Sequence, residues 1–276
     1  MELYQGVMLG ILQGLTEFLP VSSSGHLVMG QNFFGISEPA LSFDISLHMG
    51  TLLAVAVVFF SDIKAMVLSL GELFKKGSSW GSVKTLLKEN NDVKFAALII
   101  VGSVPTAVLG LMLKDYVHAL FSSLVLVGLM LMVTGTFLWF TKRVTGQGKK
   151  IEEFGFGTAL FIGLCQGIAV IPGISRSGAT IAAGLFAGLE RETAARYSFL
   201  LSIPAIVGAE ILSLRDSFAS GAVVDSVTIW GTLAAFVAGL LALVVLLRIV
   251  RKGRLYLFAP YCWAIGLIAI ISGVIL

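Results

Sequence analysis

The sequence contains few charged residues. Asp, Glu, Lys and Arg together make up 13% of the 276 residues, whereas 57% are hydrophobic, and the mean hydropathy is +0.96. A water-soluble domain of this length cannot bury so large an apolar fraction. The composition therefore indicates an integral membrane protein surrounded by lipids, and we expect no nucleic-acid partner.

Three other absences narrow the fold class. The two cysteines, Cys165 and Cys262, lie in apolar segments and form neither a disulfide pattern nor a metal-binding pattern. No segment shows the alternating hydrophobicity of an outer-membrane barrel. The first ten residues, MELYQGVMLG, lack the basic start and the cleavage site of a signal peptide, so we expect the first segment to be retained. The fold class is thus predicted to be an all-α polytopic membrane protein.

Eight apolar stretches are present, and six of them are long enough to span a bilayer. A helix needs about 20 residues to cross the hydrocarbon layer. The six predicted spanning helices cover 43–60, 95–113, 121–140, 197–214, 227–247 and 255–275. The other two stretches, 4–35 and 155–189, are interrupted by Pro, Gly and Ser into halves of about 15 residues, which are too short to span. We therefore predict that each is a re-entrant helical hairpin.

The basic residues are distributed very unevenly. Of the 19 Lys and Arg, 16 lie in the segments 61–94, 141–150, 190–196 and 248–254. Basic residues favour cytoplasmic loops. This bias is satisfied if the first hairpin enters from outside and the second from the cytoplasm, with 61–94 a cytoplasmic linker and both termini outside.

An internal repeat supports this division. An offset of 153 residues superposes GILQGLTEFLPVSSSG (10–25) on GLCQGIAVIPGISRSG (163–178). Each half, 1–145 and 150–276, would then contain one re-entrant hairpin followed by three spanning helices. Because the halves begin on opposite sides, we predict inverted-topology repeats whose hairpin tips meet near the membrane midplane.

The tips carry the motifs PVSSSGH (20–26) and PGISRSGAT (172–180). Free N–H groups at a helix break, together with a guanidinium, favour anion binding. A helix-capping role for Ser22 is the competing interpretation. The candidate substrate-binding residues are Gln13, Ser22, Ser24, Gly25, Ser175, Ser177, Gly178 and Thr180, and Arg176 is a candidate catalytic cation.

The two copies of the repeat differ at positions that matter for chemistry. Glu17 corresponds to Val170, and His26 corresponds to Ala179. A carboxylate and an imidazole in only one half are typical of a hydrolytic site rather than of a symmetric pore. His26 and Ser23 are rival candidates for the nucleophile, and Glu17 is expected to orient His26 or to bind a metal.

Three further ionisable residues, Asp44, His48 and Glu210, lie near the predicted ends of spanning helices. There they could extend to the membrane interface.

With QGLTEFLPVSSSGH (13–26) and PGISRSGAT (172–180), the chain resembles the bacterial undecaprenyl-diphosphatase family of the bacitracin-resistance type across its whole length. The resemblance implies a bacterial inner-membrane enzyme that converts undecaprenyl diphosphate to undecaprenyl phosphate at the periplasmic face and recycles the lipid carrier of cell-wall synthesis. It places Glu17, Ser22, Ser23, His26 and Arg176 in the active site.

The resemblance also implies a divalent cation bound at an E-x-x-x-E pattern, with Mg²⁺ or Ca²⁺ at Glu17. The chain departs from that pattern at Gln13, although an amide oxygen can still bind a hard cation.

Two other functions are compatible with parts of the pattern. Inverted repeats with a site at the midplane are typical of transporters, so a polyprenyl-phosphate transporter or flippase is the alternative. An anion channel has little support, because the sequence shows no ring of like charges. The sequence leaves open whether the protein forms a homodimer.

Overall fold

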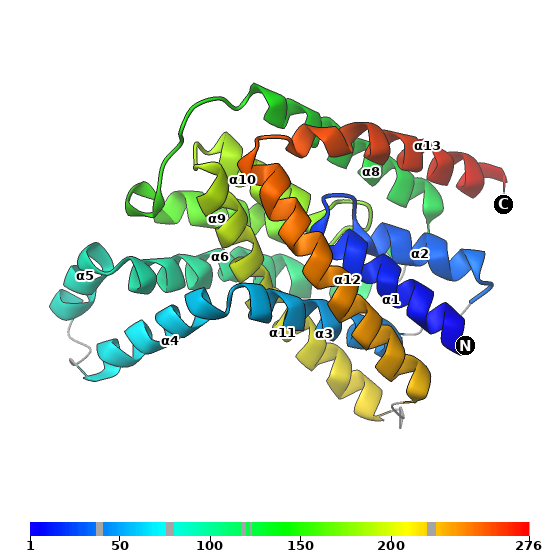
Figure 1. Ribbon diagram of the computed structural model, residues 1–276, viewed down its shortest axis with the longest axis horizontal. Coiled ribbons are helices and arrows are strands. Elements are labelled where there is room, and N and C mark those ends of the chain that lie inside the picture. Colours follow the sequence, from blue (N-terminus) through cyan, green and yellow to red (C-terminus); the bar gives the residue numbers. More distant parts are fainter. Residues whose placement is uncertain (37–40, 76–79, 117–119, 122, 220–224, 276) are drawn as a thin grey trace.

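The structure is a computed structural model that describes residues 1–36, 41–75, 80–116, 120–121, 123–219 and 225–275. These residues fold almost entirely into helices (Figure 1). Five spans within them are long and apolar enough to cross a membrane. They contain α6 (Asn91–Leu113) with η1 (Lys114–Tyr116), α8 (Leu124–Phe140) with η2 (Thr141–Arg143), α11 (Arg191–Ala219) as far as Ile211, α12 (Ser226–Arg251), and η4 (Leu255–Phe258) with α13 (Ala259–Ile275).

The sixth predicted span differs from expectation. α3 (Leu41–Val58) is followed by α4 (Phe60–Lys75), with a bend of 77° between them, and the pair counts as a sixth span only if it is taken as one. The segment 61–94, which we expect to be a cytoplasmic linker, is itself helical, since it contains most of α4 and also α5 (Trp80–Glu89). These helices mix apolar and polar residues, so they lack the continuous apolar run by which the other spans were predicted.

Both predicted breaks are confirmed. The first stretch forms α1 (Leu3–Phe18) and α2 (Ser23–Phe33), and the second forms α9 (Phe156–Ile168) and α10 (Arg176–Phe186), preceded by η3 (Ile151–Glu153). These four helices have 16, 11, 13 and 11 residues. Each is shorter than the roughly 20 residues that a membrane span requires.

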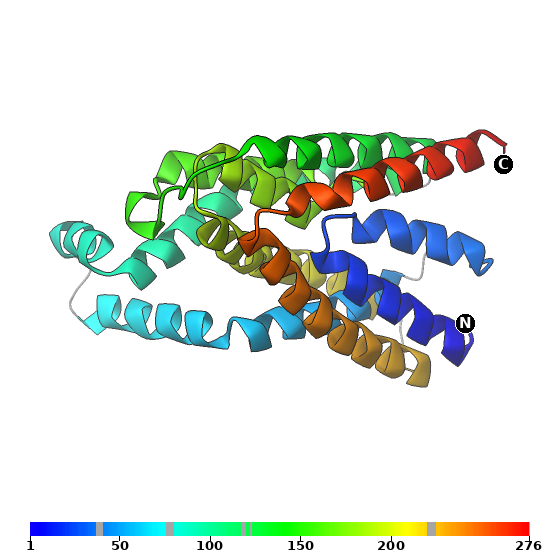
Figure 2. The ribbon, with the colours of Figure 1, turned by 45° about the horizontal axis from the view of Figure 1, so that its top comes forward.

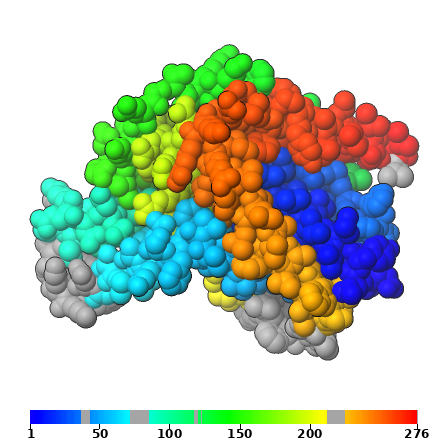
Figure 3. Space-filling view, viewed as in Figure 1, coloured from blue at the N-terminus to red at the C-terminus, as the bar shows by residue number. Residues whose placement is uncertain are grey.

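The short helices pack closely on long ones. α1 lies along α12, as the space-filling view shows (Figure 3), and α9 lies along α6. A Cβ atom added at Gly10 of α1 would collide with the carbonyl oxygen of Gly231 on α12, and one at Gly163 of α9 would collide with that of Gly102 on α6. Small residues thus let the helix backbones approach each other directly, as is common in membrane proteins.

The remaining arrangement positions the breaks. α8 and α13 lie side by side (Figure 2), and α3 packs against both α11 and α12. Both chain termini lie at one end of the long axis, whereas α5 lies at the other end (Figures 1 and 2). The break between α1 and α2 lies near the middle of this axis in both views, and its capping residue Ser22 is buried.

Candidate active site

The break between α1 and α2 is held by Ser22. This residue has a backbone φ of +68°, and no other non-glycine residue among those described has a positive φ. Its hydroxyl accepts a hydrogen bond from the N–H of Gly25 (3.4 Å) and lies 3.3 Å from the hydroxyl of Ser24. Ser22 is therefore the N-cap of α2, as the capping interpretation predicted.

The second break is built in a similar way. The Ser175 hydroxyl accepts a hydrogen bond from the N–H of Gly178 (3.1 Å) and lies 3.2 Å from the hydroxyl of Ser177. Gly173, with a φ of +94°, supplies the turn before it. In each break, a capping serine is followed by a serine two residues later and a glycine three residues later.

The two tips are in direct contact, as predicted. The N–H of Gly173 donates a hydrogen bond to the Ser22 hydroxyl (3.1 Å). Thr134 on α8 secures the second tip, because its hydroxyl donates to the carbonyl of Gly173 (2.8 Å) and accepts from the N–H of Ser175 (3.2 Å). No local signal in the sequence marks Thr134, because it lies about 40 residues before the motif that it supports.

Glu17 connects the two tips electrostatically. Its Oε2 accepts hydrogen bonds from the hydroxyl of Ser23 (2.6 Å) and from Nε2 of Gln13 (3.0 Å). Its Oε1 forms an ion pair with Nη2 of Arg176 from the other half of the chain. Glu17 is only 7% exposed, and pairing with the guanidinium offsets much of the cost of burying its charge.

Two buried groups beside Glu17 have no hydrogen-bond partner among the residues that the structure describes. Nη1 of Arg176 is a buried donor without an acceptor, and Oε1 of Gln13 is a buried acceptor without a donor. Such groups are costly in a protein interior. A bound anion at the guanidinium and a bound cation at the amide oxygen would satisfy them.

His26 lies in the same region but contacts a different set of groups. Its Nδ1 donates to the Ser22 carbonyl (2.8 Å), so in the neutral ring its Nε2 accepts from the Tyr261 hydroxyl at 2.8 Å. The two rings are stacked, with an interplanar angle of 7°. Within the described part of the chain, Glu17 contacts Ser23 rather than His26, so the expectation that Glu17 orients His26 is wrong.

Thr180 has a structural position. Its hydroxyl donates to the carbonyl of Arg176 (2.8 Å) and contacts the hydroxyl of Ser198 on α11. The side chain is fully buried, so it stabilises the first turn of α10 from the interior of the protein.

One of the three additional ionisable residues faces the site: Nε2 of His48 lies 3.8 Å from Oε2 of Glu17. Glu210 is only 6% exposed, so extension to the membrane interface is wrong for this residue. Asp44 instead accepts a hydrogen bond from Gln31 (2.7 Å).

The donor set suits a cation only in part. No group of three His, Cys, Asp or Glu side chains in the described ranges could hold a metal by itself. The Glu17 carboxylate and the free Oε1 of Gln13 are nevertheless hard oxygen ligands. Mg²⁺ is commonly held by one or two carboxylates together with substrate phosphates, and these residues fit that mode of binding.

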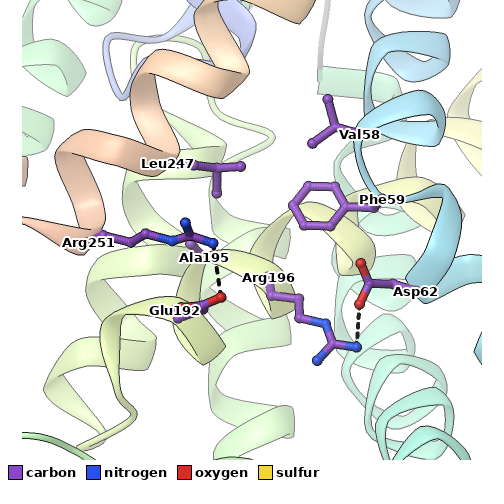
Figure 4. A pocket seen from close by; sticks show the side chains of 8 residues that line it. All are labelled: Val58, Phe59, Asp62, Glu192, Ala195, Arg196, Leu247 and Arg251. Atoms are coloured by element: carbon purple, nitrogen blue, oxygen red, sulfur yellow. Dashed lines mark hydrogen bonds and ion pairs between the residues drawn. The ribbon is translucent and has the colours of Figure 1, made fainter.

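A separate pocket of about 290 Å³ lies where the bend after α3 meets α11 and α12 (Figure 4). It is lined by two ion pairs, Arg196 with Asp62 and Arg251 with Glu192, and by apolar side chains. No residue of the two motifs lines this pocket. We therefore assign the chemistry to the facing breaks.

An arginine, a carboxylate and a serine that meet at two helix breaks inside a multi-pass bundle define a membrane enzyme acting on phosphate groups. Comparison with known proteins agrees. The family "Bacitracin resistance protein BacA" matches residues 6–268. The undecaprenyl-diphosphatase of Desulforapulum autotrophicum is 74% identical over 273 residues, which cover 99% of each chain.

More distant relatives share this name. The undecaprenyl-diphosphatase of Desulfosudis oleivorans is 59% identical over 96% of this chain and 97% of the relative. That of Methanosphaera stadtmanae is 41% identical over 100% of both chains. The chain belongs to the BacA family of undecaprenyl-diphosphatases.

Proposed function

We propose that this enzyme hydrolyses undecaprenyl diphosphate to undecaprenyl phosphate and inorganic phosphate. The observation that carries the proposal is the set of contacts at Glu17, which joins Ser23 of one tip to Arg176 of the other. The names of the relatives supply the substrate. Release of the lipid carrier for reuse in peptidoglycan synthesis would follow, together with resistance to bacitracin.

The terminal phosphate is expected to bind between the tips. The unpaired Nη1 of Arg176 is available to a phosphate oxygen, and the first N–H groups of α2 and α10 have no acceptor within their own helices. Ser22 and Ser175 are occupied as caps, so their role is to hold the tips in register. Arg176 would keep its Nη2 on Glu17 while its Nη1 binds the substrate.

Ser23 is the nucleophile that the geometry favours. Its Oγ attacks the terminal phosphorus while its proton passes to Oε2 of Glu17, 2.6 Å away. The bond from phosphorus to the bridging oxygen breaks, and undecaprenyl phosphate leaves. Water then attacks the phosphoserine, the serine oxygen recovers its proton from Glu17, and inorganic phosphate is released.

His26 takes a supporting role in this mechanism. Its Nδ1 is committed to the Ser22 carbonyl, and its Nε2 to Tyr261. It would bind a phosphate oxygen through Tyr261 or after protonation, and it would hold the capping residue in its unusual backbone conformation.

A divalent cation, Mg²⁺ or Ca²⁺, would be held by Glu17 and the amide oxygen of Gln13 together with the substrate. It would neutralise charge on the diphosphate.

Purified protein in detergent tests the reaction, since there is no membrane to cross. We expect release of inorganic phosphate from a polyprenyl diphosphate, and loss of release in Ser23→Ala and Glu17→Gln with the protein still monodisperse. Binding of the lipid without release of phosphate, with Mg²⁺, Ca²⁺ or Mn²⁺ present, would contradict the proposal and favour a carrier.

We also propose that the halves 1–145 and 150–276 are inverted repeats, with the site opening to the periplasm. The helix contacts support this, because they are matched between halves. α1 packs on α12 as α9 packs on α6, and α3 packs on α12 as α11 packs on α6. Both termini lie at the end of the molecule away from α5 (Figure 1).

Cysteine labelling tests this orientation. In a background without Cys165 and Cys262, an impermeant thiol reagent added to intact cells should label Asp115→Cys and not Thr145→Cys. Both positions are exposed, and they lie at opposite ends of the segment containing α8. Equal labelling of both would refute the orientation.

A further inference from the structure

The second step of the proposed reaction needs a hydrogen-bond acceptor that Glu17 does not provide. When the Ser23 hydroxyl attacks phosphorus, its proton passes to Oε2 of Glu17, 2.6 Å away. The protonated Oε2 must then return this proton to the serine oxygen, so it acts as a donor and not as the group that orients the attacking water. Alignment of the nucleophile contributes a large part of the rate of such a reaction. A second acceptor is therefore expected close to Glu17.

His48 on α3 has the form of such an acceptor. Its Nδ1 lies 2.8 Å from the carbonyl oxygen of Asp44. Because a carbonyl oxygen can only accept, Nδ1 carries the ring proton, and in the neutral ring Nε2 keeps its lone pair. Among the residues that the structure describes, none donates a hydrogen bond to this Nε2, which lies 3.8 Å from Oε2 of Glu17.

Nε2 of His48 also lies close to the reacting atoms. It is 3.8 Å from Oε2 of Glu17, and the same Oε2 is 2.6 Å from Oγ of Ser23. Nε2 and the serine oxygen are therefore no further apart than the sum of these two distances. A phosphoryl group on Oγ, with one water about 3 Å from phosphorus on the far side, fits into a gap of this size. That water lies within hydrogen-bond distance of Nε2, about 2.8 Å.

The other acceptors around Glu17 are occupied or inaccessible. Both ring nitrogens of His26 have partners, namely a backbone carbonyl and the Tyr261 hydroxyl. Oε1 of Gln13 has no partner, but this residue is completely buried. The side chain of His48, in contrast, is 30% exposed, so a molecule of the size of water can reach it.

We propose that His48 positions the water that hydrolyses the phosphoserine intermediate. Its Nε2 accepts a hydrogen bond from this water and directs the water oxygen at phosphorus. The water oxygen forms a bond to phosphorus, the bond from phosphorus to Oγ of Ser23 breaks, and Oγ takes the proton held by Glu17. Both water protons leave with the product as dihydrogen phosphate, so no proton has to remain on the imidazole. The inference rests on the proposed function, because it needs the phosphoserine.

The two steps of the reaction should respond differently to loss of His48. His48→Phe keeps a ring without an acceptor, so phosphoserine should form at the wild-type rate but decay about 10- to 100-fold more slowly. His48→Ala, which only removes atoms, should behave in the same way. His48→Gln places an amide oxygen near the position of Nε2 and should restore part of the decay rate. A merely structural role would slow both steps together.

The test is rapid-quench kinetics on the full-length protein in detergent, with polyprenyl diphosphate labelled with ³²P in the terminal phosphate. Acid quenching preserves phosphoserine, so its formation, its decay and the release of inorganic phosphate are measured on the same samples. Met49→Phe is the matched control, because it introduces the same side chain at the next position of α3, where the methionine is 37% exposed. It should leave both rates unchanged.

The outcomes separate this inference from the proposed function. Accumulation of phosphoserine in His48→Phe and His48→Ala, with partial recovery in His48→Gln, supports the inference. Phosphate release by wild type combined with wild-type decay in these variants, with equal slowing of both steps, or with no phosphoserine in any variant, would overturn the inference and leave the hydrolysis itself established. Absence of phosphate release from wild type would instead refute the proposed function.

Discussion

The most informative single substitution is Arg176→Lys, because it keeps the charge and removes the geometry. The guanidinium has two functions that need separate nitrogens. Nη2 pairs with Glu17, and the buried Nη1 is free for the substrate. A lysine ammonium is a compact charge that cannot present a planar pair of donors in these directions. It can therefore serve either Glu17 or the phosphate well, but not both.

The expected magnitude follows from the lost interaction. A hydrogen bond to a charged group contributes about 1.5–3 kcal/mol, and each 1.36 kcal/mol in the barrier corresponds to a factor of about ten. Arg176→Lys should therefore lower kcat/KM by about 10- to 100-fold. Because the positive charge that balances Glu17 is retained, the protein should still fold. Arg176→Ala, in contrast, leaves a buried carboxylate unpaired, which costs about 3–5 kcal/mol of stability.

Steady-state phosphate release in detergent, with melting temperatures measured on the same samples, gives both quantities. Arg251→Lys is the matched control. Its ion pair with Glu192 is exposed, at 60% and 63% for the two side chains, so a lysine should replace it with little effect. If Arg176→Lys turns over like wild type, the arginine provides only charge, and the account of the guanidinium as a two-sided clamp is refuted.

Three further predictions test packing, the histidine and a helix cap. Gly163→Ala should lower the melting temperature and reduce the free energy of unfolding by about 1–3 kcal/mol, because the added Cβ would collide with a backbone carbonyl oxygen. Gly157→Ala in the same helix adds a Cβ that has no neighbour within 4 Å, so it should leave the melting temperature unchanged. Tyr261→Phe keeps the ring but removes the hydrogen bond to His26. Because such a bond contributes about 1 kcal/mol, kcat should fall several-fold, and KM should change less. Hydrogen bonds from the hydroxyl and N–H of a threonine three residues later lower the pKa of Asp225, the N-cap of α12. Asp225→Ala should therefore lower the melting temperature at pH 7, and the difference from wild type should shrink as the pH falls through this lowered pKa.

The parts of the fold that the sequence predicts are those fixed by local chemistry. Uninterrupted apolar length identifies α6, α8, α11, α12 and α13, and the clusters around Pro20 and Pro172 identify the breaks. α4 and α5 were missed because an amphipathic helix has no such run. The bend after α3 has neither proline nor glycine at its centre, since the chain there reads Val58, Phe59, Phe60, so no turn signal marks it.

The site was predictable in its residues and less so in its contacts. Glu17, Ser23 and Arg176 come from the motifs, but the choice between Ser23 and His26 as partner of Glu17 depends on the left-handed conformation at Ser22. A serine rarely adopts that conformation, and nothing in the sequence indicates it. Contacts from distant segments were also invisible, as with Tyr261, which lies 235 residues from the histidine that it contacts.

In the proposed mechanism Ser23, activated by a Glu17 carboxylate that is itself paired with Arg176, attacks the terminal phosphorus. The most direct measurement is a single-turnover reaction of the detergent-solubilised enzyme with polyprenyl diphosphate labelled with ³²P in the terminal phosphate, quenched in acid and mapped by mass spectrometry. Phosphoserine survives acid, whereas phosphohistidine does not. We expect labelled phosphoserine at Ser23, absent from Ser23→Ala. Acid-labile label at His26, or phosphate release by Ser23→Ala at the wild-type rate, would contradict it.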